Sequence, residues 1–250
     1  MELHKFKLIA HRGEHELAPE NTITAFQLAV KQGATALEAD VRLCADGEVV
    51  LFHDYTLSRH FKDRRKIAVC TLKELKSLSF SGQSYKYPDQ IATLDELLES
   101  FKGTLPINID IKTYMIPNKE LCLKVIKTVE RHNMLNQVWV SSFNPIDLHF
   151  LKKAQPALRT GYLYNSLGMI HFFIDIFLKS DAWHPHYSQV SPGFFNLAER
   201  MGKKVYIWTV NKPAVLKKIS KHKFNGIITD NFFRTKPLAE EKQNNRKTPV

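Results

Sequence analysis

The sequence is poor in cysteine. Its 250 residues include three, Cys44, Cys70 and Cys122, which lie far apart and form no CxxC pair. Neither a disulfide framework nor a cysteine zinc site is therefore indicated. We expect reduced thiols and a cytoplasmic location.

The sequence also lacks a long hydrophobic run. Its most apolar late stretch, MIHFFIDIFL at 169–178, contains His171 and Asp175 and has about half the length of a membrane span. The segment MELHKFKLIA at 1–10 is short and charged, unlike a signal peptide. We therefore expect no stable membrane insertion.

Acidic residues are outnumbered by basic ones. The chain has 36 Lys and Arg against 25 Asp and Glu, a formal net charge of +11. This balance is compatible with nucleic acid, an anionic membrane surface or a phosphate-bearing substrate. The basic residues are dispersed in short runs such as 62–66 and 217–223, and no nucleic-acid-binding motif surrounds them. We interpret most of them as solvated surface and expect no nucleic-acid partner.

What the sequence does contain is a regular alternation of short apolar runs and helix-length amphipathic segments. Strands are predicted at 7–11, 34–43, 106–112, 137–142, 158–164, 181–187, 204–210 and 226–231. Helices are predicted at 19–33, 93–101, 118–133, 144–155, 170–179, 191–202 and 212–222. This alternation predicts an α/β fold, a TIM barrel of about eight parallel strands. The alternative is an open doubly wound sheet, but the glycine-rich phosphate loop after its first strand is absent.

One region interrupts the alternation. Residues about 55–90 follow the second strand and contain a basic loop, a small helix and a proline-containing return. We predict a small insertion here, within a single domain of residues 1–238. Such excursions from a compact barrel are more often functional than idle. The polar residues 239–250 are predicted to form a C-terminal tail.

Polar residues stand where the predicted strands end. In a TIM barrel the active site forms at the carboxyl ends of the strands. The residues at or near such ends are His11, Arg12, Glu38, Asp40, His53, Asp110 and Lys112, followed later in the chain by Ser142, His184, Trp208 and Asp230.

The carboxylates of the second and third strands have a spacing that brings them together. Glu38 and Asp40 share a face of their strand because they are two residues apart, and Asp110 shares a face with Lys112. Buried carboxylates need cationic partners or a metal ion. Three of them form an all-oxygen site for one divalent cation, Mg²⁺ or Ca²⁺. Two histidines and an arginine beside that cation indicate phosphate ester chemistry.

Each residue also has a simpler interpretation. A lone histidine at a strand end is more often structural, and Glu38 or Asp40 alone could form a salt bridge with Arg42 or Lys112. Trp208 fits packing at the rim of the barrel, and Asp230 fits a helix cap. The functional interpretation is favoured because independent strands all place polar residues at one end of the barrel.

Several motifs resemble those of a known family. They are HRG at 11–13, PENT at 19–22, LEADVRLCADGEVVLFHD at 37–54, NIDIK at 108–112, WTVN at 208–211 and GIITDN at 226–231. In this order they resemble the glycerophosphodiester phosphodiesterase family over nearly the whole chain. The resemblance implies a TIM barrel with a small insertion, a divalent cation and a small-molecule phosphodiester substrate. The implied reaction is hydrolysis of glycerophosphodiesters, the deacylated remains of phospholipids, to glycerol 3-phosphate and an alcohol.

The resemblance also implies roles for individual residues that contact the substrate. The acid–base histidines of the family correspond to His11 and His53. Its phosphate-contacting arginine corresponds to Arg12. The lysine of its third-strand motif corresponds to Lys112, and the tryptophan near its substrate entrance to Trp208.

The metal ligands of the family correspond to Glu38, Asp40 and Asp110. The third ligand is usually glutamate in the family, and Asp110 is shorter by one methylene group. The resemblance therefore leaves both Mg²⁺ and Ca²⁺ open.

Two other functions remain open at this point. A lysophospholipase D-type or sphingolipid head-group phosphodiesterase would use the same barrel, and the basic insertion and the segment 169–178 leave room for an acyl chain. A non-enzymatic phosphate-binding scaffold on a decayed barrel would have lost one of the histidines or carboxylates, and all of them are present.

Overall fold

The strands of the protein form a closed barrel. The computed structural model describes residues 6–80, 85–113, 116–165 and 169–231. Parallel strands in these ranges are β1 (Lys7–His11), β2 (Ala36–Leu43), β4 (Ile107–Ile111), β5 (Val138–Ser142), β6 (Arg159–Tyr164), β7 (Ala182–Pro185), β8 (Lys204–Ile207) and β9 (Gly226–Thr229). They pair in the order β1-β9-β8-β7-β6-β5-β4-β2, and β1 pairs with β2 to close the sheet. The predicted TIM barrel is confirmed.

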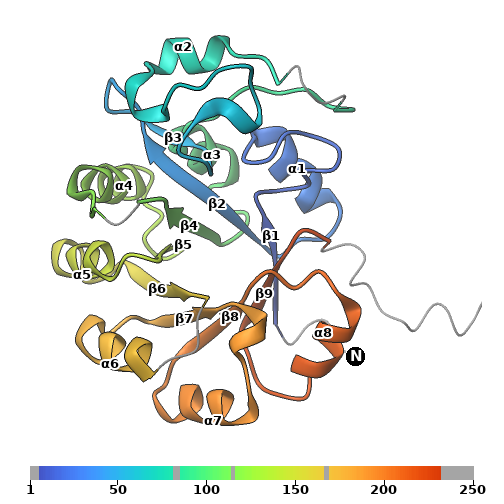
Figure 1. The fold of residues 1–250 in the computed structure, drawn as a ribbon, viewed down its shortest axis with the longest axis vertical. Helices are drawn as coiled ribbons and strands as arrows, with labels where there is room; N and C mark the ends of the chain where they lie inside the picture. Colours follow the sequence, from blue (N-terminus) through green and yellow to red (C-terminus); the bar gives the residue numbers. More distant parts are fainter. Residues whose placement is uncertain (1–5, 81–84, 114–115, 166–168, 232–250) are drawn as a thin grey trace, which may run out of the picture.

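Helices cover the outside of the barrel between successive strands (Figure 1). They are α1 (Ile23–Lys31), α3 (Leu94–Phe101), α4 (Lys119–Arg131), α5 (Pro145–Ala154), α6 (Met169–Leu178), α7 (Pro192–Arg200) and α8 (Pro213–Ile219). The first helix starts later than the predicted residue 19. The Thr22 side chain accepts a hydrogen bond from the backbone N–H of Ala25 (3.2 Å) and so caps the helix at that point.

The region after β2, described at residues 55–80 and 85–90, lies beyond α1 and α3 at the top of the view (Figure 1). The strand β3 (Val49–Leu51) pairs antiparallel with β2, which turns the chain back on itself. The helix α2 (Leu72–Ser77) follows, with a capping box between Thr71 and Glu74. This segment has a small apolar core of its own, which includes Val50, Phe52, Leu57, Phe61, Ile67, Leu75 and Phe80.

The division into one domain over 1–238 stays a prediction, and the predicted tail at 239–250 lies outside the described residues.

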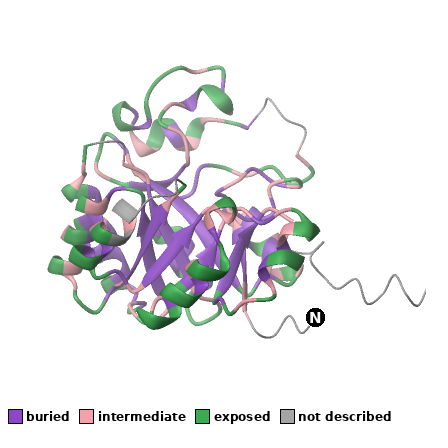
Figure 2. Ribbon diagram, turned by 60° about the horizontal axis from the view of Figure 1, so that its bottom comes forward, coloured by how far each residue is buried: buried purple, intermediate pink, exposed green. Residues whose placement is uncertain are grey.

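Apolar side chains fill both sides of the barrel wall, and the strands are buried beneath exposed helix surfaces (Figure 2). Inside the barrel, Trp139 and Tyr206 stack with ring centroids 5.1 Å apart. Nε1 of Trp139 donates a hydrogen bond to Nε2 of His184 (3.3 Å), which is fully buried. A Cβ at Gly161 would lie 2.4 Å from that same nitrogen. Glycine at this position therefore makes room for the imidazole.

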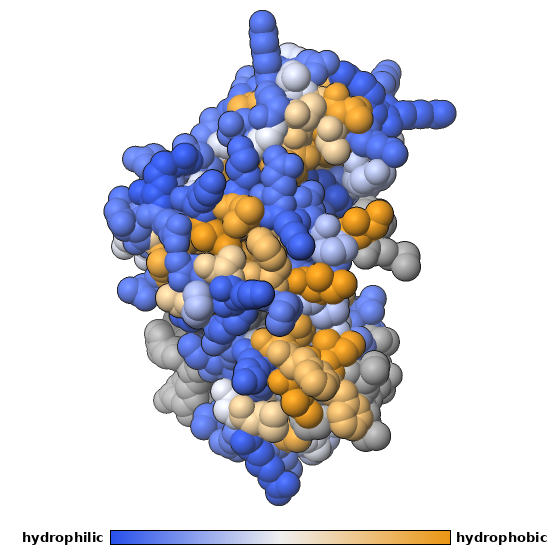
Figure 3. Space-filling view, turned by 90° about the vertical axis from the view of Figure 1, so that its left-hand side faces the viewer, coloured by the Kyte–Doolittle hydropathy of each residue, from blue (hydrophilic) through white to orange (hydrophobic). Residues whose placement is uncertain are grey.

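The helix α6 buries an acidic residue beside Leu178 and exposes part of its apolar surface. Asp175 is only 2% exposed; it accepts a hydrogen bond from Nε1 of Trp183 (2.9 Å) and lies 2.6 Å from Nζ of Lys203. Phe173 and Phe177 face outward instead, with exposed fractions of 50% and 80%. Apolar surface is visible on the side of the molecule where α6 lies (Figure 3). None of the described helices is long and apolar enough to cross a bilayer.

Candidate active site

A pocket of about 260 Å³ opens at the carboxyl ends of the barrel strands. Its lining comes from the ends of most of the strands: His11, Arg12, Glu38, His53, Asn108, Asp110, Lys112, Ser141, Phe143, Leu163, Trp208, Thr209 and Ile228. Seven of the eight residues to which the family resemblance assigns roles are in this lining. The eighth, Asp40, is fully buried directly behind it and contacts Arg12 and Lys112.

The three acidic residues come together because β2 and β4 are neighbours in register. Asp40 pairs with Asp110 across the two strands. Glu38, Asp40 and Asp110 are all buried, and each offers an oxygen within 4.8 Å of the others. Oδ1 of Asp110 has no hydrogen-bond partner among the residues that the structure describes. Burial raises the pKa of Glu38, and it raises the pKa of Asp110 to about 6, with further contributions from the neighbouring carboxylates. An all-oxygen set with an unpartnered buried oxygen fits a hard divalent cation.

Two cations complete the wall of the pocket. Nε of Arg12 lies 2.9 Å from Oδ2 of Asp40, and Nζ of Lys112 lies 2.9 Å from Oδ1 of Asp40 and 2.5 Å from Oδ2 of Asp110. Burial alone would raise the pKa of Asp40. The two cations outweigh this effect and hold that pKa well below its usual range. Both cations line the pocket beside the carboxylates, where a phosphate group would meet positive charge.

The backbone conformation after β1 requires the glycine of the HRG motif. Arg12 has φ +60° and Gly13 has φ +84°, so the chain turns sharply as β1 ends. A Cβ at Gly13 would lie 2.6 Å from the backbone carbon of Ala25. Only glycine fits this turn, which directs His11 and Arg12 to the mouth of the barrel.

His11 is held by a carboxylate from the last strand end. Its Nδ1 donates to Oδ1 of Asp230 (2.5 Å), and Nε2 of His15 donates to the same oxygen (3.0 Å). Nδ2 of Asn211 donates to the other oxygen of Asp230 (2.5 Å). Burial lowers the pKa of His11, and the bond to Asp230 opposes this shift. With Nδ1 engaged, Nε2 is the nitrogen of His11 left for proton transfer.

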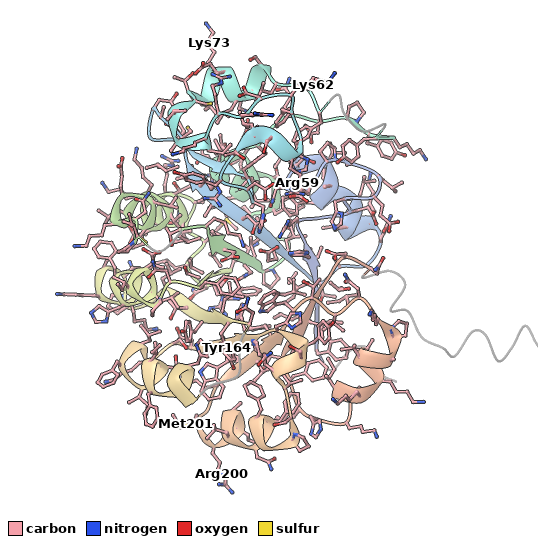
Figure 4. The ribbon with its side chains drawn as sticks, in the orientation of Figure 1. Arg59, Lys62, Lys73, Tyr164, Arg200 and Met201 are labelled. Carbon is pink, nitrogen blue, oxygen red and sulfur yellow. The ribbon has the colours of Figure 1, made fainter. Side chains whose placement is uncertain are left out.

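His53 is held by the residue that follows it. Its Nδ1 donates to Oδ1 of Asp54 (2.6 Å), and burial lowers its pKa. Nε of Arg59 donates to the other oxygen of Asp54. Arg59 also donates to Glu20 (3.0 Å), which lies 3.2 Å from Arg12. Arg59 belongs to the region after β2 and lies on its barrel side (Figure 4), so this network links that region to the pocket.

Trp208 follows β8 at the rim of the pocket. Its Nε1 donates to the backbone carbonyl of His184 (2.8 Å), and its ring makes an edge contact with Phe143 at 5.5 Å. Predicted strand 204–210 ends at Ile207 instead, so Trp208 stands just beyond the strand.

Sequence reasoning missed the residues that hold the histidines. Asp230 was named as a strand-end residue with a helix cap as its simpler interpretation, but its hydrogen bonds from His11 and His15 were not predicted. Asp54 carried a signal, since it is adjacent to a candidate histidine. Asn21 also carried a signal, because it belongs to the PENT motif. In the structure its Nδ2 donates to Oδ2 of Asp40 (2.9 Å). Arg59 had no signal, because it comes from a basic loop whose position depends on the fold.

The fold is a TIM barrel with a polar pocket at the carboxyl ends of its strands, and comparisons place it among the phosphoric diester hydrolases. Residues 11–233 match the glycerophosphoryl diester phosphodiesterase family, and the chain belongs to it. It is 33% identical over 231 residues to a glycerophosphodiester phosphodiesterase of Caldanaerobacter subterraneus, an alignment that covers 90% of this chain and 94% of that protein.

Solved structures give the same result. An Oleispira antarctica phosphodiesterase in complex with the product sn-glycerol-3-phosphate has a TM-score of 0.83 and 28% identity, covering 91% of this chain and 94% of that one. A glycerophosphodiester phosphodiesterase from Thermotoga maritima has a TM-score of 0.76 and 28% identity, covering 92% and 96%.

Proposed function

We propose that this enzyme hydrolyses glycerophosphodiesters to glycerol 3-phosphate and an alcohol, that it requires a divalent cation, and that His11 and His53 transfer the protons. The observation that carries the proposal is the pocket itself. Two imidazoles line it, each held through Nδ1 by a carboxylate, beside two cations and three buried acidic residues.

The histidines would divide the proton transfers between them. One accepts a proton from the attacking hydroxyl, which belongs to water or to the glycerol half of the substrate. The other gives a proton to the departing alcohol oxygen as its bond to phosphorus breaks. Arg12 and Lys112 would bind the phosphate oxygens and stabilise the charge that develops on them. Trp208 would contact the substrate at the rim.

The cation would be held by Glu38, Asp40 and Asp110. Mg²⁺ and Ca²⁺ both suit oxygen ligands. When bound, such an ion neutralises charge on the phosphate oxygens. The three free, buried cysteines are consistent with a reducing compartment, and we propose that the enzyme acts in the cytoplasm on a small-molecule substrate.

The test is release of glycerol 3-phosphate from a panel of glycerophosphodiesters by enzyme first stripped with chelator. We expect no product until Mg²⁺ or Ca²⁺ is added. Calorimetry on the same stripped enzyme should show one cation site that is weakened in Asp110→Asn. Full turnover in excess chelator would contradict the metal requirement, and no turnover of any substrate with metal present would contradict the function.

A lysophospholipase D-type activity has one supporting observation. A hollow of about 280 Å³ with apolar residues such as Ile67, Ile116 and Leu121 lies beside the site and shares Lys112 with it. The segment 169–178 gives no support, because none of its described side chains lines the pocket. Faster hydrolysis of lysophosphatidylcholine than of glycerophosphocholine would favour this activity.

A further inference from the structure

The active-site pocket continues into a second hollow outside the barrel. This outer groove has a volume of about 490 Å³ and is lined by Arg42, His53, Tyr55, Thr56, Lys112 and Phe143, among others. Three of these residues, His53, Lys112 and Phe143, also line the inner pocket. A phosphodiester bound beside His53 and Lys112 would therefore have one substituent in the inner pocket and the other in the outer groove.

The two aromatic rings of the outer groove already face cations of the protein. Nζ of Lys66 lies 5.0 Å from the ring centroid of Tyr55, and the guanidinium carbon of Arg42 lies 6.0 Å from it. Nζ of Lys112 lies 6.0 Å from the ring centroid of Phe143. An ammonium group of a ligand would gain cation–π attraction from either ring only by approaching a lysine or arginine. Repulsion between like charges offsets that attraction.

The outer groove also has little negative charge. Of the carboxylates in the part of the chain that the structure describes, only Asp54 lines it. Both oxygens of Asp54 accept hydrogen bonds, one from His53 and the other from Arg59. A cationic substituent of a ligand would therefore find no carboxylate in the groove that is not already engaged.

We propose that the outer groove binds the alcohol half of the substrate and selects uncharged polyols and anionic alcohols over ammonium alcohols such as choline and ethanolamine. This inference rests on the proposed function and specifies its substrate class. The inner pocket would hold the glycerol 3-phosphate half, which every substrate shares. Hydroxyl and anionic oxygens accept hydrogen bonds from lysine and arginine, whereas a trimethylammonium group cannot.

The experiment compares kcat/KM for glycerophosphoglycerol and glycerophosphocholine with the metal-loaded enzyme. We expect kcat/KM to be about tenfold higher for glycerophosphoglycerol. Repulsion between like charges several ångströms apart is large enough to produce a difference of this size. The preference should shrink as ionic strength rises.

A charge reversal tests the groove directly. Lys66 is exposed, and Lys66→Glu should lower the preference by about tenfold because it exchanges repulsion of choline for attraction. Lys73→Glu makes the same charge change at the outer end of the region after β2, where Lys73 points away from the barrel (Figure 4). This control should leave the preference unchanged.

The possible outcomes separate this inference from the proposed function. Hydrolysis of glycerophosphocholine at an equal or greater rate, or equal effects of Lys66→Glu and Lys73→Glu, would overturn the selectivity while leaving the hydrolase intact. Faster turnover of lysophosphatidylcholine than of glycerophosphoglycerol would show that a choline alcohol half is accepted and would overturn the selectivity as well. Failure of every substrate with metal present would overturn both proposals.

Discussion

The two histidines of the pocket are held by carboxylates in different ways. Asp230 reaches His11 from the opposite end of the chain, and the two residues meet because β1 and β9 are neighbours in the barrel. Asp54 directly follows His53 and needs no distant strand. One histidine–carboxylate pair is therefore formed by closure of the barrel, and the other by two adjacent residues of the sequence.

The charges around the two pairs also differ. The carboxylate of Asp54 is offset by Arg59, a permanent cation. The carboxylate of Asp230 is shared with a neutral amide and with His15, whose pKa is raised by that same bond. The charge on His15 depends on pH near its own pKa. We infer that His11 depends more strongly on its carboxylate than His53 does.

The largest expected effect comes from removing either imidazole. His11→Ala and His53→Ala should each lower kcat by about a hundredfold or more, because each loses a proton transfer. The rate of glycerol 3-phosphate release measures this. His149→Ala, at an exposed position on α5, is the matched control and should retain full activity. Near-normal activity in either pocket variant would contradict the acid–base assignment.

The next effect separates the two carboxylates. Asp230→Asn should lower kcat by about tenfold or more with little change in KM, and Asp54→Asn should lower it less. Asp230 raises the pKa of His11, so its removal lowers that pKa. The limb of the pH–rate profile that reports His11 should therefore move to lower pH, whichever proton transfer His11 performs. Equal losses in the two variants and an unmoved limb would show that the pairs are equivalent.

A smaller effect is expected from the cation that offsets Asp54. Arg59→Met removes the cation that offsets the negative charge of Asp54. The Asp54 carboxylate then stabilises protonated His53 more strongly and raises the pKa of His53. The corresponding limb should move to higher pH, opposite to Asp230→Asn, with a change of a few fold in kcat. Arg65→Met is the control, since Arg65 also bridges two carboxylates, of Asp63 and Glu74, in the same region. A shift of equal size in both variants would argue against the role of Arg59.

The sequence predicted what depends on local pattern. Alternation of apolar and amphipathic segments was sufficient for the barrel. Strand ends indicated seven of the residues that line the pocket, whereas Asp40, Ser142, His184 and Asp230 lie outside that lining. The His11–Asp230 pair could not be predicted, because it joins residues 219 positions apart through barrel closure. The burial of Asp175 on α6 depends on Trp183 and Lys203, which lie outside that helix, so the outward apolar face of α6 was missed too.

His184 is a third histidine in the barrel, and no carboxylate among the described residues holds it. It is fully buried, its Nδ1 has no hydrogen-bond partner in the described part of the chain, and burial lowers its pKa from 6.5 to about 3. Above the ordinary value the ring is neutral in both the folded and the unfolded chain. Between about 6.5 and 3 the unfolded chain binds a proton that the folded protein excludes. This residue should therefore lower the free energy of unfolding by about 1.4 kcal/mol for each unit that the pH falls in that range.

Chemical denaturation between pH 7 and 5 measures this contribution as a difference between wild type and His184→Gln. The glutamine side chain keeps an acceptor for Trp139 but does not titrate, so the difference in unfolding free energy should shrink steadily as the pH falls. His149→Gln should leave the wild-type slope unchanged, because that residue is exposed. A constant difference would mean that His184 takes up its proton in the folded barrel. Its unpartnered nitrogen would then need an acceptor, which a carboxylate supplies to both histidines of the pocket.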